Sequence, residues 1–113
     1  MRFLATVWFL TAMILGAQEA PKHKNLKVLK DDDVRAVMGA MQGALGQKCT
    51  FCHDMKDFAS DENPKKLIAR GMMELANDIN GKFHDGKTHV TCYTCHRGST
   101  TPETAPPPTP PAQ

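Results

Sequence analysis

All four cysteines of the chain lie in two copies of one five-residue pattern, Cys-x-x-Cys-His. The first copy is Cys49-Thr50-Phe51-Cys52-His53, and the second is Cys92-Tyr93-Thr94-Cys95-His96. Within one helical turn this spacing places both sulfurs and the imidazole on the same side. Two thiols can add to the vinyl groups of a porphyrin while the histidine binds its iron. The pattern therefore predicts two covalently attached c-type haems, with Cys49, Cys52, Cys92 and Cys95 as attachment points and His53 and His96 as iron ligands.

Three other uses of paired cysteines compete with this interpretation. A Cys₄ zinc site usually separates its pairs by about 15–20 residues, whereas here the longer segment 53–91 lies between them. A Cys₄ zinc site is complete with its four cysteines, so it does not explain the histidine directly after each pair. A thioredoxin-like redox pair would need a flanking strand–helix pattern, which this sequence does not have. A disulfide framework is the strongest alternative, because the chain begins like an exported protein.

Residues 1–17 have the layout of a secretory signal peptide. Arg2 precedes an apolar run over residues 3–15, and Gly16-Ala17 provides a cleavage site. The run is shorter than the roughly 20 residues that a membrane-spanning helix needs, although an uncleaved anchor is the alternative. We therefore expect cleavage after Ala17, a periplasmic location, no membrane span in the mature protein, and a linker at residues 18–24.

The foldable part of the chain is short. Residues 99–113 contain six of the eight prolines and predict a disordered tail. This leaves residues 25–98 as the domain, which is marginal for a core made of protein alone. The two haems are therefore expected to form most of the core. The 14 basic residues nearly balance the 12 acidic ones, which excludes a typical nucleic-acid surface.

Two helices are predicted, each followed by one of the cysteine motifs. The first covers residues 31–45, with Asp31 as its N-cap and Gly46 as its stop. The second covers residues 64–80, with a cap at Asn63 and a stop at Gly81. Its apolar residues form one stripe, Leu67, Ile68, Met72, Leu75 and Ile79. No alternating run long enough for a strand is present, so we expect a mainly α fold built from two helix–turn–CxxCH units.

Each iron also needs a sixth ligand or an open position. Methionine pairs lie in the middle of both helices, at Met38 and Met41 and at Met72 and Met73. A methionine on an apolar stripe usually packs in a core, but here the cofactor is expected to be that core. His/Met ligation would raise the reduction potential. The histidines of the second connector, His84 and His89, are the rival ligands and would give a bis-His haem of lower potential.

Several strings of the sequence accompany the two motifs. They are Val37-Met38-Gly39-Ala40-Met41, Ala44-Leu45-Gly46, Phe58-Ala59-Ser60-Asp61, Ala69-Arg70-Gly71-Met72 and Val90-Thr91 with the second motif up to Gly98. Together these strings resemble the family of photosynthetic reaction centre cytochrome c subunits. The resemblance covers residues 25–98. It implies that helical methionines serve as sixth ligands, Met38 for the first haem and Met72 for the second. It also implies that Arg70 neutralises a haem propionate.

The chain departs from that family in ways that limit the resemblance. The family's subunit carries four haems in two related halves and commonly a lipid-bearing cysteine, whereas this chain has two haem motifs and no such cysteine. The resemblance therefore implies the fold and the ligands but not photosynthesis. A head-to-head homodimer that recreates four haems is a further hypothesis.

The function expected from these observations is electron transfer in the periplasm between redox partner proteins, without enzymatic activity. The alternative is a haem enzyme, such as a peroxidase, or a gas-binding haem sensor. Either would need one iron with an open or labile distal position.

Overall fold

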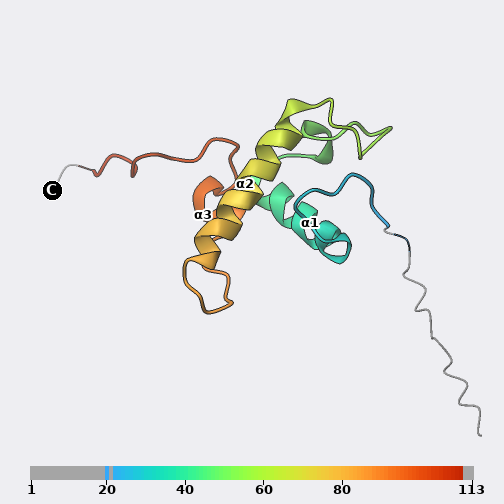
Figure 1. Ribbon diagram of the computed structural model, residues 1–113. Coiled ribbons are helices and arrows are strands. Elements are labelled where there is room, and N and C mark those ends of the chain that lie inside the picture. Colours follow the sequence, from blue (N-terminus) through green and yellow to red (C-terminus); the bar gives the residue numbers. More distant parts are fainter. Residues whose placement is uncertain (1–19, 21, 111–113) are drawn as a thin grey trace, which may run out of the picture.

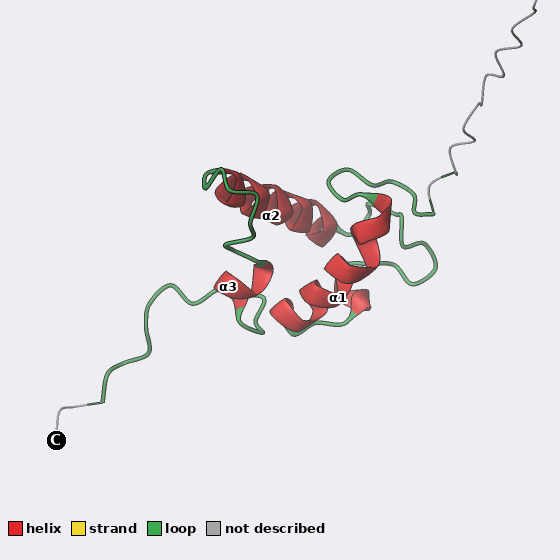
Figure 2. Cartoon of the chain, turned by 90° about the horizontal axis from the view of Figure 1, so that it is seen from below, coloured by secondary structure: helices red, strands yellow, loops and turns green. Residues whose placement is uncertain are grey.

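The computed structural model describes residues 20 and 22–110 of the chain. Helices are the only regular secondary structure in this part, which confirms the mainly α fold (Figure 2). In chain order they are the 3₁₀ turn Asp31–Asp33, α1 (Val34–Leu45), the 3₁₀ turn Cys49–Phe51, α2 (Pro64–Gly81) and α3 (Cys92–His96). The short α3 packs mainly on α1 and also touches α2 (Figure 1). Among the described residues, no helix has the length and apolarity needed to cross a bilayer.

The start of α1 differs from the prediction. Asp31 lies in a 3₁₀ turn, the α-helix begins at Val34, and no side chain caps it. The carboxylate of Asp31 instead accepts hydrogen bonds from the backbone N–H groups of Lys22 and His23, at 2.9 and 2.7 Å. The bond from Lys22 is the main reason why the pKa of Asp31 is lowered. The N-cap prediction for Asp31 is therefore wrong, because this side chain ties the preceding segment to the start of the helix.

The end of α1 lies against the end of α3. Gly46 adopts a left-handed conformation with φ of 62°, as the sequence predicts for a stop. The backbone N–H of Gly98 donates to the carbonyl of Ala44 at 2.8 Å. A Cβ atom on Gly46 would collide with the carbonyl oxygen of Gly98, so only glycine permits this approach. The two cysteine motifs are consequently held on neighbouring elements.

The boundaries of α2 follow its local signals closely. Asn63 caps the helix by accepting from the backbone N–H of Lys65 at 3.0 Å, and Pro64 occupies the first turn. The other end lies one residue beyond the prediction. Gly81 is still helical, and Lys82 is the C-cap with an ordinary right-handed backbone.

The helices bury little apolar surface among themselves. Ala44 is the one buried hydrophobic residue in the described part of the chain. The apolar stripe of α2 is exposed, comprising Leu67, Ile68, Met72, Leu75 and Ile79. We call these five residues the outer stripe. An exposed apolar patch of this kind marks a surface that another group covers.

Both ends of the chain extend beyond the helical region. Residues 99–110 contain no helix or strand and run away from the three α-helices (Figure 1). The predicted signal peptide at residues 1–17 and the final residues 111–113 lie outside the described part. The cleavage site, the linker at 18–24, the domain boundaries and the disorder of the tail stay predictions.

Candidate haem sites

The first cysteine motif lines a cavity with a volume of about 920 Å³, which we call the large cavity. That size lies within the range of about 300–1,000 Å³ that is usual for cofactor sites. Its wall includes Cys49, Cys52 and His53 of the motif. One face of α1 lines the same cavity, with Val34, Met38, Met41 and Leu45. Two thiols, an imidazole and thioethers around one apolar space are the donor set that a c-type haem requires, so these residues fit the group.

The cysteines are available for covalent attachment. All four are free thiols in the structure. Gln42 lies within hydrogen-bond distance of Cys49, with 3.3 Å between its Nε2 and the sulfur. Burial raises the pKa of the Cys52 thiol, while the nearby charge of Lys65 acts in the opposite direction. Nowhere in residues 20 and 22–110 do three or more His, Cys, Asp or Glu side chains gather as metal ligands, so the geometry gives no support to the zinc alternative.

Both motif histidines are oriented in the same way. The Nδ1 atom of His53 lies 3.0 Å from the carbonyl oxygen of Phe58, and that of His96 lies 2.8 Å from the carbonyl oxygen of Ser99. A carbonyl can only accept, so Nδ1 carries the hydrogen in each ring. The lone pair of Nε2 is then free to bind a metal. The sequence pattern gave no indication of these two carbonyls, because any residue type supplies one.

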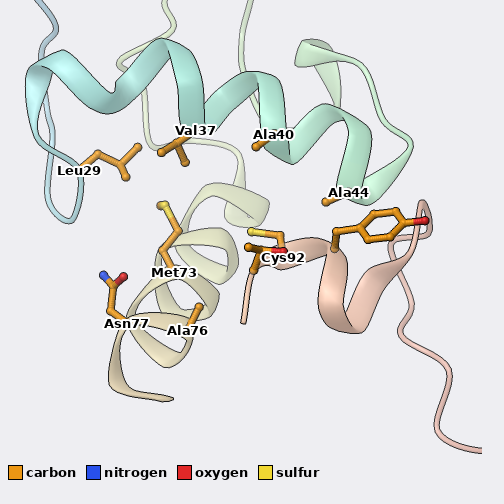
Figure 3. A pocket seen from close by; sticks show the side chains of 10 residues that line it. Leu29, Val37, Ala40, Ala44, Met73, Ala76, Asn77 and Cys92 are labelled. Carbon is orange, nitrogen blue, oxygen red and sulfur yellow. The ribbon is translucent and has the colours of Figure 1, made fainter. Parts of the chain in front are cut away.

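The methionines are divided between the cavity and the surface. Met38 and Met41 both line the large cavity from α1. Met73 of α2 lines it as well. It also lines the smaller cavity drawn in Figure 3, where its side chain is directed toward Val37 of α1. Met72, the next residue, points outward and is 47% exposed on the outer stripe. The structure therefore brings three methionines to the first site and leaves Met72 on another face of α2.

The second motif forms a more open site. It occupies α3, whose start is closed by a capping box between Thr91 and Thr94. Cys92 lines a cavity of about 270 Å³ between α1, α2 and α3 (Figure 3). Cys95 is exposed, and Met72 lines neither cavity. The donor types of a haem site are present, but the structure does not gather them around one cavity as it does for the first motif.

Two asparagines attach the motifs to opposite ends of α2. The Nδ2 atom of Asn63 donates to the carbonyl of Phe51 in the first motif at 3.0 Å. Asn80 accepts from the backbone N–H groups of His89 and Val90 at 2.8 and 2.9 Å and donates to the carbonyl of Val90 at 2.9 Å. The helix thus positions the chain before or within each motif. Sequence reasoning identified Asn63 as a cap but missed Asn80.

Arg70 belongs to the first site. It lines the large cavity, forms an ion pair with Asp61 at 2.9 Å and donates to the carbonyl of Asn25 at 3.2 Å. The hydrogen bond from Arg70 is the main cause that holds the pKa of Asp61 far below its usual range. Lys66, which the sequence did not single out, is buried beside them and also lines this cavity.

The rival histidine ligands lie in the loop after α2. His89 stacks on Phe83 with ring centroids 3.8 Å apart, and its Nε2 is 2.9 Å from a carboxylate oxygen of Asp85. His84 adopts a left-handed backbone conformation with φ of 53°. Neither histidine lines either cavity. The structure thus gives the His89 side chain local partners, and it places neither histidine at these two cavities.

Comparison with known proteins places this architecture in a family. The profile of the photosynthetic reaction centre cytochrome c subunit matches residues 12–107. The chain belongs to this family. Membership confirms the resemblance.

Individual relatives show the same relationship over a limited length. The chain is 36% identical over 91 residues to cytochrome c-554 of Chloroflexus aurantiacus, a match that covers 73% of this chain and 22% of the relative. It is 37% identical over 97 residues to the photosynthetic reaction center cytochrome c subunit of Thermochromatium tepidum, covering 80% and 24%. The subunit of Roseobacter denitrificans is 33% identical over 103 residues, covering 77% and 28%. The chain spans about a quarter of the length of these family members.

Proposed function

We propose that this family member transfers electrons in the periplasm by means of two covalently attached c-type haems. The observation that carries the proposal is the first cavity, where a CxxCH motif faces a methionine-bearing helix. The second motif repeats the arrangement of histidine and backbone carbonyl. Two relatives are named as a cytochrome c or a cytochrome c subunit, which supports covalent haem attachment in this chain.

Each role in this proposal falls to a residue of this chain. When bound, haem iron supplies a reversible one-electron change. The cysteines would fix the porphyrin edge, and His53 and His96 would bind iron through Nε2. Met38 and Met72 are the proposed sixth ligands, which would favour the reduced state and raise the potential. Arg70, at 16% side-chain exposure in the wall of the first cavity, would offset propionate charge.

Contact between the elements that carry the two motifs supports electron exchange between the haems. The end of α1, next to the first motif, is hydrogen-bonded through Ala44 to Gly98, just after the second. An electron entering at one motif would therefore have a short route to the other. We infer that redox proteins donate and accept the electrons, and that no substrate is transformed.

The decisive experiment is the mass and optical spectrum of the protein produced in a host that matures c-type cytochromes. We expect the chain from Gln18 onward plus two haems, and low-spin spectra in both oxidation states with the weak near-infrared band of sulfur ligation. A colourless protein would refute the proposal. Carbon monoxide binding to the reduced protein would favour the haem enzyme or sensor, and a dimeric mass in solution would support the homodimer hypothesis.

Methionine variants within the same experiment test the ligands. Met38→Ala and Met72→Ala should retain both haems but each remove the sulfur band and lower the potential at one site. The matched controls are Met41→Ala and Met73→Ala, which delete the neighbouring thioethers. A larger spectral change in a control would reassign the ligand while leaving the cytochrome function intact.

A further inference from the structure

The carbonyl oxygen of Phe58 accepts two hydrogen-bond donors. One is Nδ1 of His53, the proposed iron ligand, at 3.0 Å. The other is the Nζ atom of Lys66, also at 3.0 Å. Lys66 is buried, with 9% of its surface exposed, and its ammonium group also donates to the carbonyl of Ser60 at 2.6 Å. A buried cation thus shares the single acceptor that orients the first histidine.

The second site has no equivalent of this cation. His96 is held in the same way, by the carbonyl oxygen of Ser99 at 2.8 Å. In the described part of the chain, no lysine or arginine donates to that carbonyl. Ser99 is also exposed, so water can reach its surroundings. The two histidines therefore have similar geometry but different electrostatic environments.

The charge around Lys66 is only partly compensated. Asp61 lies 3.4 Å from Lys66 and 2.9 Å from Arg70, so one carboxylate serves two cations. The pKa of Asp61 is held far below its usual range, mainly by the bond from Arg70, and its charge persists at neutral pH. The cluster of Lys66, Arg70 and Asp61 hence carries one net positive charge behind His53.

We propose that Lys66 is a positioning residue that raises the potential of the first haem above that of the second. An ammonium bound to the Phe58 oxygen withdraws electron density from it and makes it a poorer acceptor for His53. The imidazole then gives less electron density to iron, which destabilises the oxidised state. The inference rests on the proposed function. It predicts that the two haems are reduced in a fixed order, the first haem before the second.

The test is potentiometric titration of the haem-loaded protein, with the haem methyl signals in proton NMR reporting each haem separately. In Lys66→Met, the ratio of reduced to oxidised first haem at a fixed potential should fall by about tenfold, the lower end of the effect that outer-shell partners of metal-ligating histidines have on metal affinity or activity. For a one-electron couple that corresponds to about 59 mV. The second haem should keep its midpoint, and the Nδ1 proton signal of His53 should move as its hydrogen bond strengthens.

Two further variants separate this role from others. Lys66→Arg retains the cation and should keep the wild-type midpoint even if Lys66→Met folds poorly. Lys65→Met removes the same charge from the adjacent residue, whose Nζ lies 4.5 Å from the centroid of the Phe51 ring in the first motif. It should change the potential much less, because Lys65 does not contact the Phe58 carbonyl.

The outcomes distinguish this inference from the function on which it rests. Equal shifts in Lys65→Met and Lys66→Met would indicate a general field effect and overturn the inference. An unchanged first midpoint in Lys66→Met, or a large shift in Lys66→Arg, would also overturn it. Absence of covalent haem in the wild type would instead refute the proposed function.

Discussion

At the residue scale, one carboxylate organises the contacts behind the first motif. Asp61 accepts from Nδ2 of Asn25 at 2.8 Å and pairs with Arg70 and Lys66, at 2.9 and 3.4 Å. These bonds, led by that from Arg70, hold its pKa far below the usual range. The side chain is 47% exposed, so water screens part of the attraction. Asp61 connects α2 to the segment before α1, which no local sequence pattern indicates.

The lowered pKa of Asp61 predicts how its contribution varies with pH. A carboxyl with a depressed folded pKa stabilises the native state above its unfolded pKa of about 3.9, and the stabilisation is lost as pH falls toward the folded pKa. Asp61→Asn should therefore lower the melting temperature at pH 7. The difference from wild type should shrink as the pH is reduced from 5 to 2.5. Thermal melts of the oxidised protein at each pH measure this difference in melting temperature.

The neighbouring carboxylate provides the control for this experiment. Glu62 is exposed, and no salt bridge involves it in the part of the chain that the structure describes. Glu62→Gln should therefore follow the wild-type melting curve at every pH. If Asp61→Asn ran parallel to wild type across the acid range, the ion pairs of Asp61 would contribute nothing to stability.

At the element scale, α2 positions both motifs through its two terminal asparagines. Asn63 holds Phe51 by one hydrogen bond, and Asn80 holds His89 and Val90 by three. The α3 helix has only five residues and cannot be stable alone. Its place therefore depends on its packing against α1, on the bond from Gly98 to Ala44, and on the contacts of Asn80.

Removal of Asn80 should affect the second site selectively. Asn80→Ala deletes three hydrogen bonds, two of them partly buried and one exposed. The two partly buried bonds are worth about 1 kcal/mol each, so we expect a loss of about 2 kcal/mol in the free energy of unfolding. Mass spectrometry should also reveal a fraction that lacks the second haem. The control is Asp78→Asn, at an exposed position of α2 that lines neither cavity. Equal stability and equal haem content in the two variants would contradict the assigned role.

How far the sequence predicted these elements depends on the range of the interactions. The limits of α2 were predictable to within one residue because Asn63 and Pro64 act locally. The start of α1 was not, because Asp31 bonds to residues 22 and 23 in place of its own helix. A helix usually turns its apolar stripe toward the protein core, yet the outer stripe of α2 is exposed. Only the position of α1 decides that Met73 faces inward.

At the scale of the whole molecule, the candidate sites take the place that a hydrophobic core has in other domains. The two motifs and the two longer helices, α1 and α2, were readable from the sequence, because cysteine spacing and apolar periodicity are local, whereas the five-residue α3 was not among the predicted helices. The cation behind His53 was not, since Lys66 and Phe58 meet only when the segment between them folds back. Ala44 remains the one buried apolar residue among those described. Packing within the polypeptide is therefore too sparse to hold the three α-helices together.

This sparse packing predicts that the chain needs its haems in order to fold. A variant with all four cysteines replaced by alanine, made in a host without cytochrome maturation, should be largely unfolded. The outer stripe and the wall of the large cavity would otherwise expose apolar surface, with nothing to offset the entropy of ordering the chain. Far-ultraviolet circular dichroism should show little helix and no cooperative melt, whereas the haem-loaded protein should melt cooperatively. A haem-free chain with native helix content and a sharp thermal transition would mean that protein contacts alone define the fold. The haem sites would then exist in the folded chain before the cofactor is attached.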